Sequence, residues 1–187
     1  MNRTVSARVS ALALAAAALV ALAGCADDGA GTGADSPVAT TAPTSASSAV
    51  SAADCDGVFV TVQYGGVLGG NSADACVAAS APITAAAALR AAHFRTEGTA
   101  QYGDLVVCRV NGAPAASRPF TVPGQKPYTE KCQGMPPAFA YWAMWVRPSA
   151  DGTWGYADSG VGTQQLKPGQ TLGLKFTTGT DTTPPQG

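Results

Sequence analysis

The residues best able to do chemistry in this 187-residue chain are its five cysteines and its single histidine, His93. Cysteine can carry an acyl group, form a disulfide, bind a metal or act as a nucleophile, and its surroundings decide among these uses. Cys25 stands apart near the N-terminus, and the other four are Cys55, Cys76, Cys108 and Cys132. One histidine without a G-x-S-x-G motif offers no hydrolase triad. We therefore expect no catalytic residues and no enzyme activity.

Cys25 ends a segment that has the features of a bacterial export signal. Two arginines, Arg3 and Arg8, precede an unbroken apolar run over residues 11–23, which is too short to span a bilayer comfortably. Residues 22–25 (LAGC) resemble the lipoprotein box. The resemblance implies that Cys25 receives a diacylglyceryl group and becomes the first residue of the mature chain. Its acyl chains would then hold the protein in the lipid bilayer, at the extracytoplasmic face of the cell membrane. The alternative is an ordinary signal peptide that happens to end in a cysteine.

The segment after the box has the composition of a tether. We expect residues 1–24 to be the signal peptide and residues 25–53 to be the lipidated cysteine with a disordered tether. Residues 26–53 are mostly Ala, Ser, Thr, Gly and Pro and contain no aromatic residue. Such a segment buries too little surface to offset its ordering entropy, and as a coil its ends would lie roughly 30 Å apart. Residues 179–187 are also predicted to be a disordered tail.

The four remaining cysteines predict two disulfides. An even number of cysteines in an exported chain is typical of a disulfide framework, and four of them allow three pairings. We favour Cys55–Cys76 with Cys108–Cys132, because each pair brackets one local excursion of the chain. A zinc site is the alternative. No two of these cysteines have the C-x-x-C spacing and the only histidine is distant, so we expect no metal.

Charge and composition exclude several classes of protein. The formal net charge is −1, and 12% of the residues are charged, against roughly 25% in an average soluble protein. A nucleic-acid-binding protein usually carries a basic field, so we expect no nucleic-acid partner. A single short apolar run also argues against a protein that spans the membrane several times.

The distribution of aromatic residues marks out one folded unit. Every Trp, Tyr and Phe lies between Phe59 and Phe176, which predicts a domain over residues 54–178. β-branched and aromatic runs predict strands over residues 58–64, 74–79, 105–110, 139–146, 154–156 and 172–176. Thr84 can cap an alanine-rich helix over residues 85–92. A hairpin, one helix and further strands favour an α+β fold, with the helix across a mixed β-grasp-like sheet.

Several of these segments resemble the transcobalamin C-terminal domain. They are the first strand to Gly65, the alanine-rich helix to Phe94, residues 107–112 (VCRVNG), 141–142 (YW), 154–156 (WGY) and 166–174 (LKPGQTLGL). The similarity covers about residues 57–177. It implies a soluble-ligand-binding β-grasp fold and a corrinoid such as cobalamin as ligand. It also implies a helical-barrel protein or an importer as partner. In the animal carriers a helical barrel covers the other side of the ligand, and this chain has no such barrel.

Three aromatic residues are the candidate ligand-binding side chains. Trp154 and Tyr156 follow a predicted turn and flank Gly155, so a flat ring could lie on the strand between them. Tyr141 lies in the most aromatic strand. No cofactor is expected. Capture of a small ligand at the cell surface for uptake is thus our hypothesis. The alternative is a structural or protein-interaction module of the envelope, in which all of these aromatics belong to the core.

Overall fold

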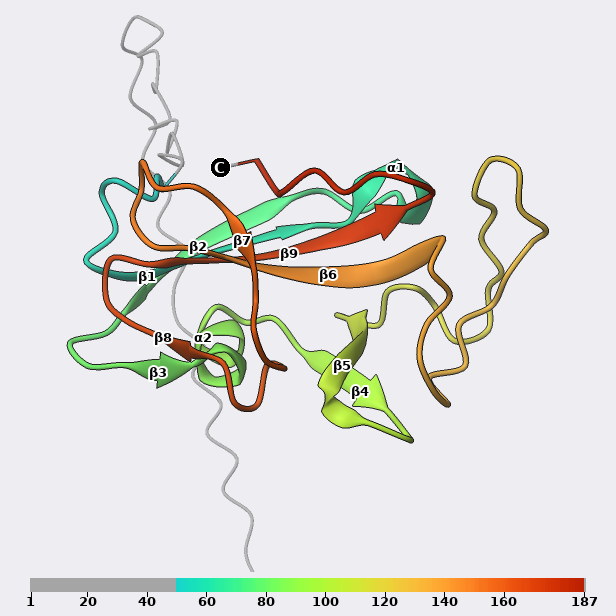
Figure 1. Cartoon of the computed structure of the whole chain (residues 1–187), viewed down its shortest axis with the longest axis horizontal. Helices are drawn as coiled ribbons and strands as arrows, with labels where there is room; N and C mark the ends of the chain where they lie inside the picture. The colour runs from blue at the N-terminus through green and yellow to red at the C-terminus, as the bar shows by residue number, and fades with distance from the viewer. Residues whose placement is uncertain (1–49, 187) are drawn as a thin grey trace, which may run out of the picture. The chain divides into compact units, whose positions relative to one another are not determined.

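The computed structural model describes residues 50–186, which form an α+β fold built mostly of strands (Figure 1). Its centre is a five-stranded sheet with the order β2-β1-β9-β6-β7. These strands are β1 (Gly57–Gln63), β2 (Ala73–Ala78), β6 (Ala140–Arg147), β7 (Gly155–Tyr156) and β9 (Thr171–Thr178). β1 and β9 are parallel, and the other neighbours in the sheet are antiparallel. Within residues 50–186, no helix is long and apolar enough to cross a membrane.

The predicted N-terminal hairpin is confirmed. β1 is a run of β-branched and aromatic residues that is buried on both sides, and β2 returns antiparallel to it. The glycine-rich stretch between them makes a single helical turn, α1 (Gly65–Leu68), and ends at Gly69 in the left-handed conformation with a φ of 64°. A disulfide between Cys55 and Cys76 ties the residues before β1 to β2. The hairpin is therefore held by hydrogen bonds and by a covalent link.

The helix α2 (Ala85–Ala91) begins where the sequence predicts. The Thr84 side chain accepts a hydrogen bond of 3.2 Å from the backbone N–H of Ala87, as an N-terminal cap does. β3 (Ile83–Thr84) precedes the helix and pairs with β8 (Gln165–Leu166). The helix buries Ala85, Ala88 and Leu89 in the core, and the two small alanine side chains let it approach the sheet closely.

A second hairpin lies beside strand β6 of the sheet. β4 (Thr96–Thr99) and β5 (Gly103–Val110) pair antiparallel, and the predicted turn follows β5 at Asn111, which has a φ of 49°. The second predicted disulfide, Cys108–Cys132, is also present. It joins β5 to the long connection that leads to β6, so this connection is fixed at both ends.

The two faces of the sheet are both covered (Figure 1). On the inner face, alternate residues such as Val58, Val60 and Leu174 pack with α2 in one apolar core. On the outer face, residues 179–186 run back over β9. Lys175 pairs with Asp181 at 2.8 Å, and Gln63 donates to the carbonyl of Gln186 at 2.6 Å. The sequence predicts a disordered tail here, whereas residues 179–186 contribute part of the layer that covers the sheet.

Candidate functional site

A groove of about 620 Å³ opens beside β6, between β5 and the residues that follow β7. Its volume lies within the usual range of small-ligand sites, roughly 300–1,000 Å³. Most of the side chains that line it are apolar or aromatic. The lining residues come from four segments: 105–107 of β5, the stretch 135–138, 141–144 of β6 and 156–161. β6 and β5 thus form two walls, and two connections complete the groove.

Exposed apolar side chains converge on this groove. Leu105, Met135 and Tyr156 are 63%, 65% and 50% exposed, and all three line it. The other exposed large hydrophobic side chains in the described part of the chain are Val50 and Tyr102, which are less exposed than these three. An apolar patch that gathers in a concave surface marks a binding site more often than single exposed side chains do. The groove is therefore the candidate site of this domain.

Tyr156 presents an aromatic ring at the groove, and a second ring supports it. β7 pairs with β6 so that Tyr156 lies opposite Trp145, and the two rings stack with centroids 3.8 Å apart. Burial raises the pKa of the Tyr156 hydroxyl above its ordinary value, and the nearby Tyr141 acts in the same direction. The Tyr156 hydroxyl thus stays neutral at physiological pH. An aromatic face with a neutral hydroxyl suits a ligand that has both apolar and polar parts.

Tyr141 and Tyr156 are brought together, whereas Trp154 lies elsewhere. Trp154 does not line the groove. Its ring lies over Gly173 on the outer face of the sheet, where a Cβ on that glycine would come within 3.0 Å of it. The Arg147 guanidinium is 4.8 Å from the centre of the Trp154 ring, a cation–π contact. Of the three candidate ligand-binding residues, two belong to one groove and the third covers the sheet.

The groove also contains residues that the sequence analysis did not single out as ligand contacts. Leu105, Met135, Met144 and Asp158 line it together with the two tyrosines. These residues come from segments that are distant in sequence, so no local pattern relates them. The one available signal in the sequence was Leu105, an apolar residue at the start of a predicted strand. In the structure its side chain is mostly exposed.

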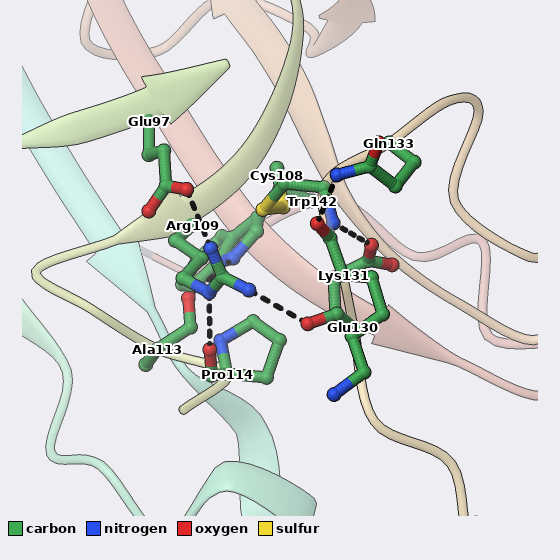
Figure 2. Close-up of polar contacts among 10 residues, drawn as sticks. Glu97, Cys108, Arg109, Ala113, Pro114, Glu130, Lys131, Gln133 and Trp142 are labelled. Carbon is green, nitrogen blue, oxygen red and sulfur yellow. Dashed lines mark hydrogen bonds and ion pairs between the residues drawn. A yellow bond between two sulfur atoms is a disulfide. The ribbon is translucent and has the colours of Figure 1, made fainter. Parts of the chain in front are cut away.

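A second cluster of polar side chains braces the connection between β5 and β6 (Figure 2). Arg109 is 5% exposed, pairs with Glu97, and donates to the carbonyls of Pro114 and Glu130 at 2.9 and 2.6 Å. The Glu130 carboxylate accepts from the backbone N–H of Cys132 at 2.6 Å. In Figure 2 these groups surround the disulfide and point toward one another. No buried side-chain nitrogen or oxygen of Arg109 or Glu130 is left without a hydrogen-bond partner.

The same cluster is the one group in the described residues with metal-ligand geometry. Ligand atoms of Cys108, Glu130 and Cys132 lie within 4.8 Å of one another. The two sulfur atoms are bonded to each other, and the carboxylate already accepts hydrogen bonds from Cys132 and from the Tyr128 hydroxyl. A metal ligand needs a deprotonated thiolate, which a disulfide does not provide. The cluster in this state is a structural brace.

His93 and two loop aspartates, Asp151 and Asp158, belong to no such group. His93 is exposed just after α2, where its backbone takes a left-handed φ of 63°. Asp151 accepts a hydrogen bond from Ser149 at 2.8 Å, which lowers the pKa of its carboxyl group. Asp158 lines the groove. Cys25, the predicted site of lipidation, lies outside the described residues.

Comparison of this chain with models of known protein families, with curated proteins and with solved structures finds no match.

Proposed function

We propose that this protein is a lipoprotein that captures a small amphipathic ligand at the extracytoplasmic face of the cell membrane. Cys25, at the end of the export signal, carries the lipid, and residues 26–53 connect it to the binding domain. Two or three acyl chains anchor a protein firmly, whereas one binds only marginally. The proposal is for binding without chemistry on the ligand.

One observation carries the binding part of the proposal: three exposed apolar side chains converge on a groove of ligand size. Leu105, Met135 and Tyr156 would be hydrated without a ligand, and covering them releases that water at a favourable free energy of roughly 25 cal/mol per Å². A flat ring can stack on Tyr156, which Trp145 supports from behind. Tyr141 can contact the polar edge of the ligand.

The sheet order supports the β-grasp part of the proposal. β2-β1-β9-β6 places the first and last long strands side by side and parallel, with the helix α2 on one face. This arrangement is the one expected of a β-grasp domain related to the transcobalamin C-terminal domain. On that basis a corrinoid such as cobalamin is the first ligand to test, and a helical-barrel protein or an importer is the expected partner. One open groove should bind such a ligand weakly, because a partner must enclose its other side.

The test is a titration of residues 50–187 with cyanocobalamin, followed by quenching of tryptophan fluorescence. We expect Tyr156→Ala to weaken binding roughly three- to tenfold, the loss of one good aromatic contact. Trp154→Ala is the matched control, since Trp154 lies outside the groove, and it should change binding by less than about twofold. Equal losses in both variants, or no binding at millimolar ligand with a helical-barrel partner present, would contradict the corrinoid proposal.

A further inference from the structure

One edge of β6 is paired along its whole length, and the other edge is not. β9 pairs with β6 from Ala140 to Arg147. On the opposite edge, β7 pairs only with Trp145 and Val146. Residues 140–144 therefore have no strand partner on this edge within the described part of the chain. This stretch of five residues is roughly 17 Å long at the usual rise of a strand.

Hydrogen bonds at the two ends of this stretch show which backbone groups face the free edge. Ala157 donates to the carbonyl of Met144 at 2.9 Å, and Ala140 donates to the carbonyl of Pro137 at 3.0 Å. Neither bond involves β9, so the N–H of Ala140 and the C=O of Met144 point away from β9. In an antiparallel strand this direction alternates. Trp142 therefore points its N–H and C=O to the free edge too, and no hydrogen bond within residues 50–186 reaches either group from that side.

The free edge is a wall of the groove. Trp142 and Met144 line the groove together with the exposed Leu105, Met135 and Tyr156. An unpaired strand edge beside apolar side chains is the geometry that an added strand needs. The backbone hydrogen bonds supply affinity, and alternate side chains of the added strand enter apolar space on either side. An apolar ring could cover the side chains but would leave these backbone groups without partners.

The charge of the groove indicates which side chains a peptide bound there should carry. Asp158 is the one charged residue among those that line it, and no Lys or Arg does so. Asp104 lies beside Gly160 and Gly162 of the adjoining segment, so a second carboxylate flanks the same end. Charge complementarity favours a basic side chain at this end of a bound peptide.

We propose that the ligand of this groove is an extended oligopeptide that hydrogen-bonds as an added strand to the backbone N–H and C=O of Trp142. The peptide places apolar side chains against Leu105, Met135 and Tyr156 and a basic side chain near Asp158. This inference rests on the proposed function, because it takes the same groove as the binding site. It adds the class of the ligand, which is set by the backbone groups of β6.

Backbone methylation of the peptide tests the strand geometry directly. The probe is a capped hexapeptide of five valines and one terminal lysine, titrated against residues 50–187 by calorimetry. In an added strand, every second amide N–H points at β6. Of these amides, the one that donates to the Trp142 carbonyl matters most, because Ala157 already donates to the Met144 carbonyl. We expect N-methylation of that amide to weaken binding roughly three- to tenfold. Methylation of the intervening amides should change it by less than about twofold. A series without this alternation would overturn the proposal.

A charge variant tests the orientation of the basic side chain. Asp158→Asn should weaken binding of the lysine peptide by roughly threefold or more and leave a valine–serine peptide unaffected. Asp151→Asn is the matched control, because Asp151 bonds to Ser149 and does not line the groove. If Asp158→Asn and Asp151→Asn bind the lysine peptide alike, the assignment of this groove to a basic peptide is wrong.

The remaining outcomes separate this inference from the proposed function. Binding of cyanocobalamin without binding of any peptide would overturn the peptide assignment and leave capture of a small ligand standing. Binding of neither probe would overturn both. Light scattering shows whether the protein is a dimer. A dimer that dissociates in the Asp158→Asn variant or on addition of peptide would show that the free edge of β6 pairs with a second copy of the chain. That result too would overturn the peptide assignment.

Discussion

Arg109 is the side chain on which the connection between β5 and β6 most depends. Its guanidinium is buried and offers a rigid fork of donors, which a lysine could not reproduce. Two backbone carbonyls, those of Pro114 and Glu130, accept from it, and Glu97 supplies the opposite charge. These contacts hold the residues on either side of the Cys108–Cys132 disulfide. A single residue thus positions the segment from which Met135 reaches the groove.

Arg109→Leu is expected to lower the free energy of unfolding of residues 50–187 by about 3 kcal/mol. The leucine fills part of the space but leaves two buried carbonyls without donors, at a cost of about 1–3 kcal/mol each before relaxation. Urea denaturation measures the change. Arg118→Leu, at an exposed position, is the control and should cost less than about 0.5 kcal/mol. Equal stability of the two variants would show that Arg109 is not a brace.

At the scale of elements, the segment 179–186 is held to the outer face by one ionic contact. Lys175 pairs with Asp181 at 2.8 Å and donates to the Thr183 hydroxyl at 2.6 Å. The hydrogen bond from Lys175 holds the pKa of the Asp181 carboxyl group well below its ordinary value of 3.8, and the Thr183 side chain acts in the same direction. Docking of this segment therefore favours the ionised carboxylate.

Because the pKa of Asp181 is lowered, its contribution is complete above the ordinary value of 3.8 and is lost as the pH falls through the lowered value. We expect the segment to loosen in acid before the domain unfolds. Hydrogen exchange of the Gln63 side-chain amide, which bonds to Gln186, reports this loosening. Asp181→Asn should give the same fast exchange at neutral pH. Pro185 of the same segment lies against Gly173 of β9. Slow exchange in the Asp181→Asn variant would mean that this contact alone holds residues 179–186 to the sheet.

Much of the fold could be predicted from the sequence because its signals are local. The β-branched run of β1, the cap at Thr84 and the turn at Asn111 each specify their own element. Both disulfides could be predicted from the even number of cysteines after Cys25 and from the short sequence separation within each pair. The short strands β3, β4 and β8 were missed, because two to four residues carry no periodic pattern and depend on partners distant in sequence.

The groove could be predicted only in part for the same reason. Tyr141 and Tyr156 were recognised by residue type, and the pairing of β7 with β6 brings them together. Trp154 precedes Tyr156 by two residues, and alternation along a strand would place both on one surface. The two residues do share a face of the sheet, because Gly173 and Tyr156 both lie opposite Trp145. The Trp154 ring, however, covers Gly173, which has no side chain of its own, and does not reach the groove. Packing against a glycine on another strand leaves no local trace in sequence.

At the scale of the whole molecule, the function that we propose needs an anchor, a tether and a binding domain. The groove lies in the domain, where Tyr156 of β7 offers an aromatic ring and β6 offers unpaired backbone groups. The anchor that we propose, Cys25, precedes the domain in sequence. If this division of roles is right, each function can be removed without the other.

The most direct test of this account is the distribution of bound ligand between membranes and soluble extract. The full chain is expressed in a bacterium that exports and lipidates it. The extract is then equilibrated with labelled cyanocobalamin or the labelled hexapeptide and centrifuged. We expect protein and ligand to sediment together for the wild type. With Cys25→Ser both should stay in the soluble fraction, and with Tyr156→Ala the protein should sediment without the ligand. Equal sedimentation of ligand in all three samples would contradict a membrane-anchored module that binds through this groove.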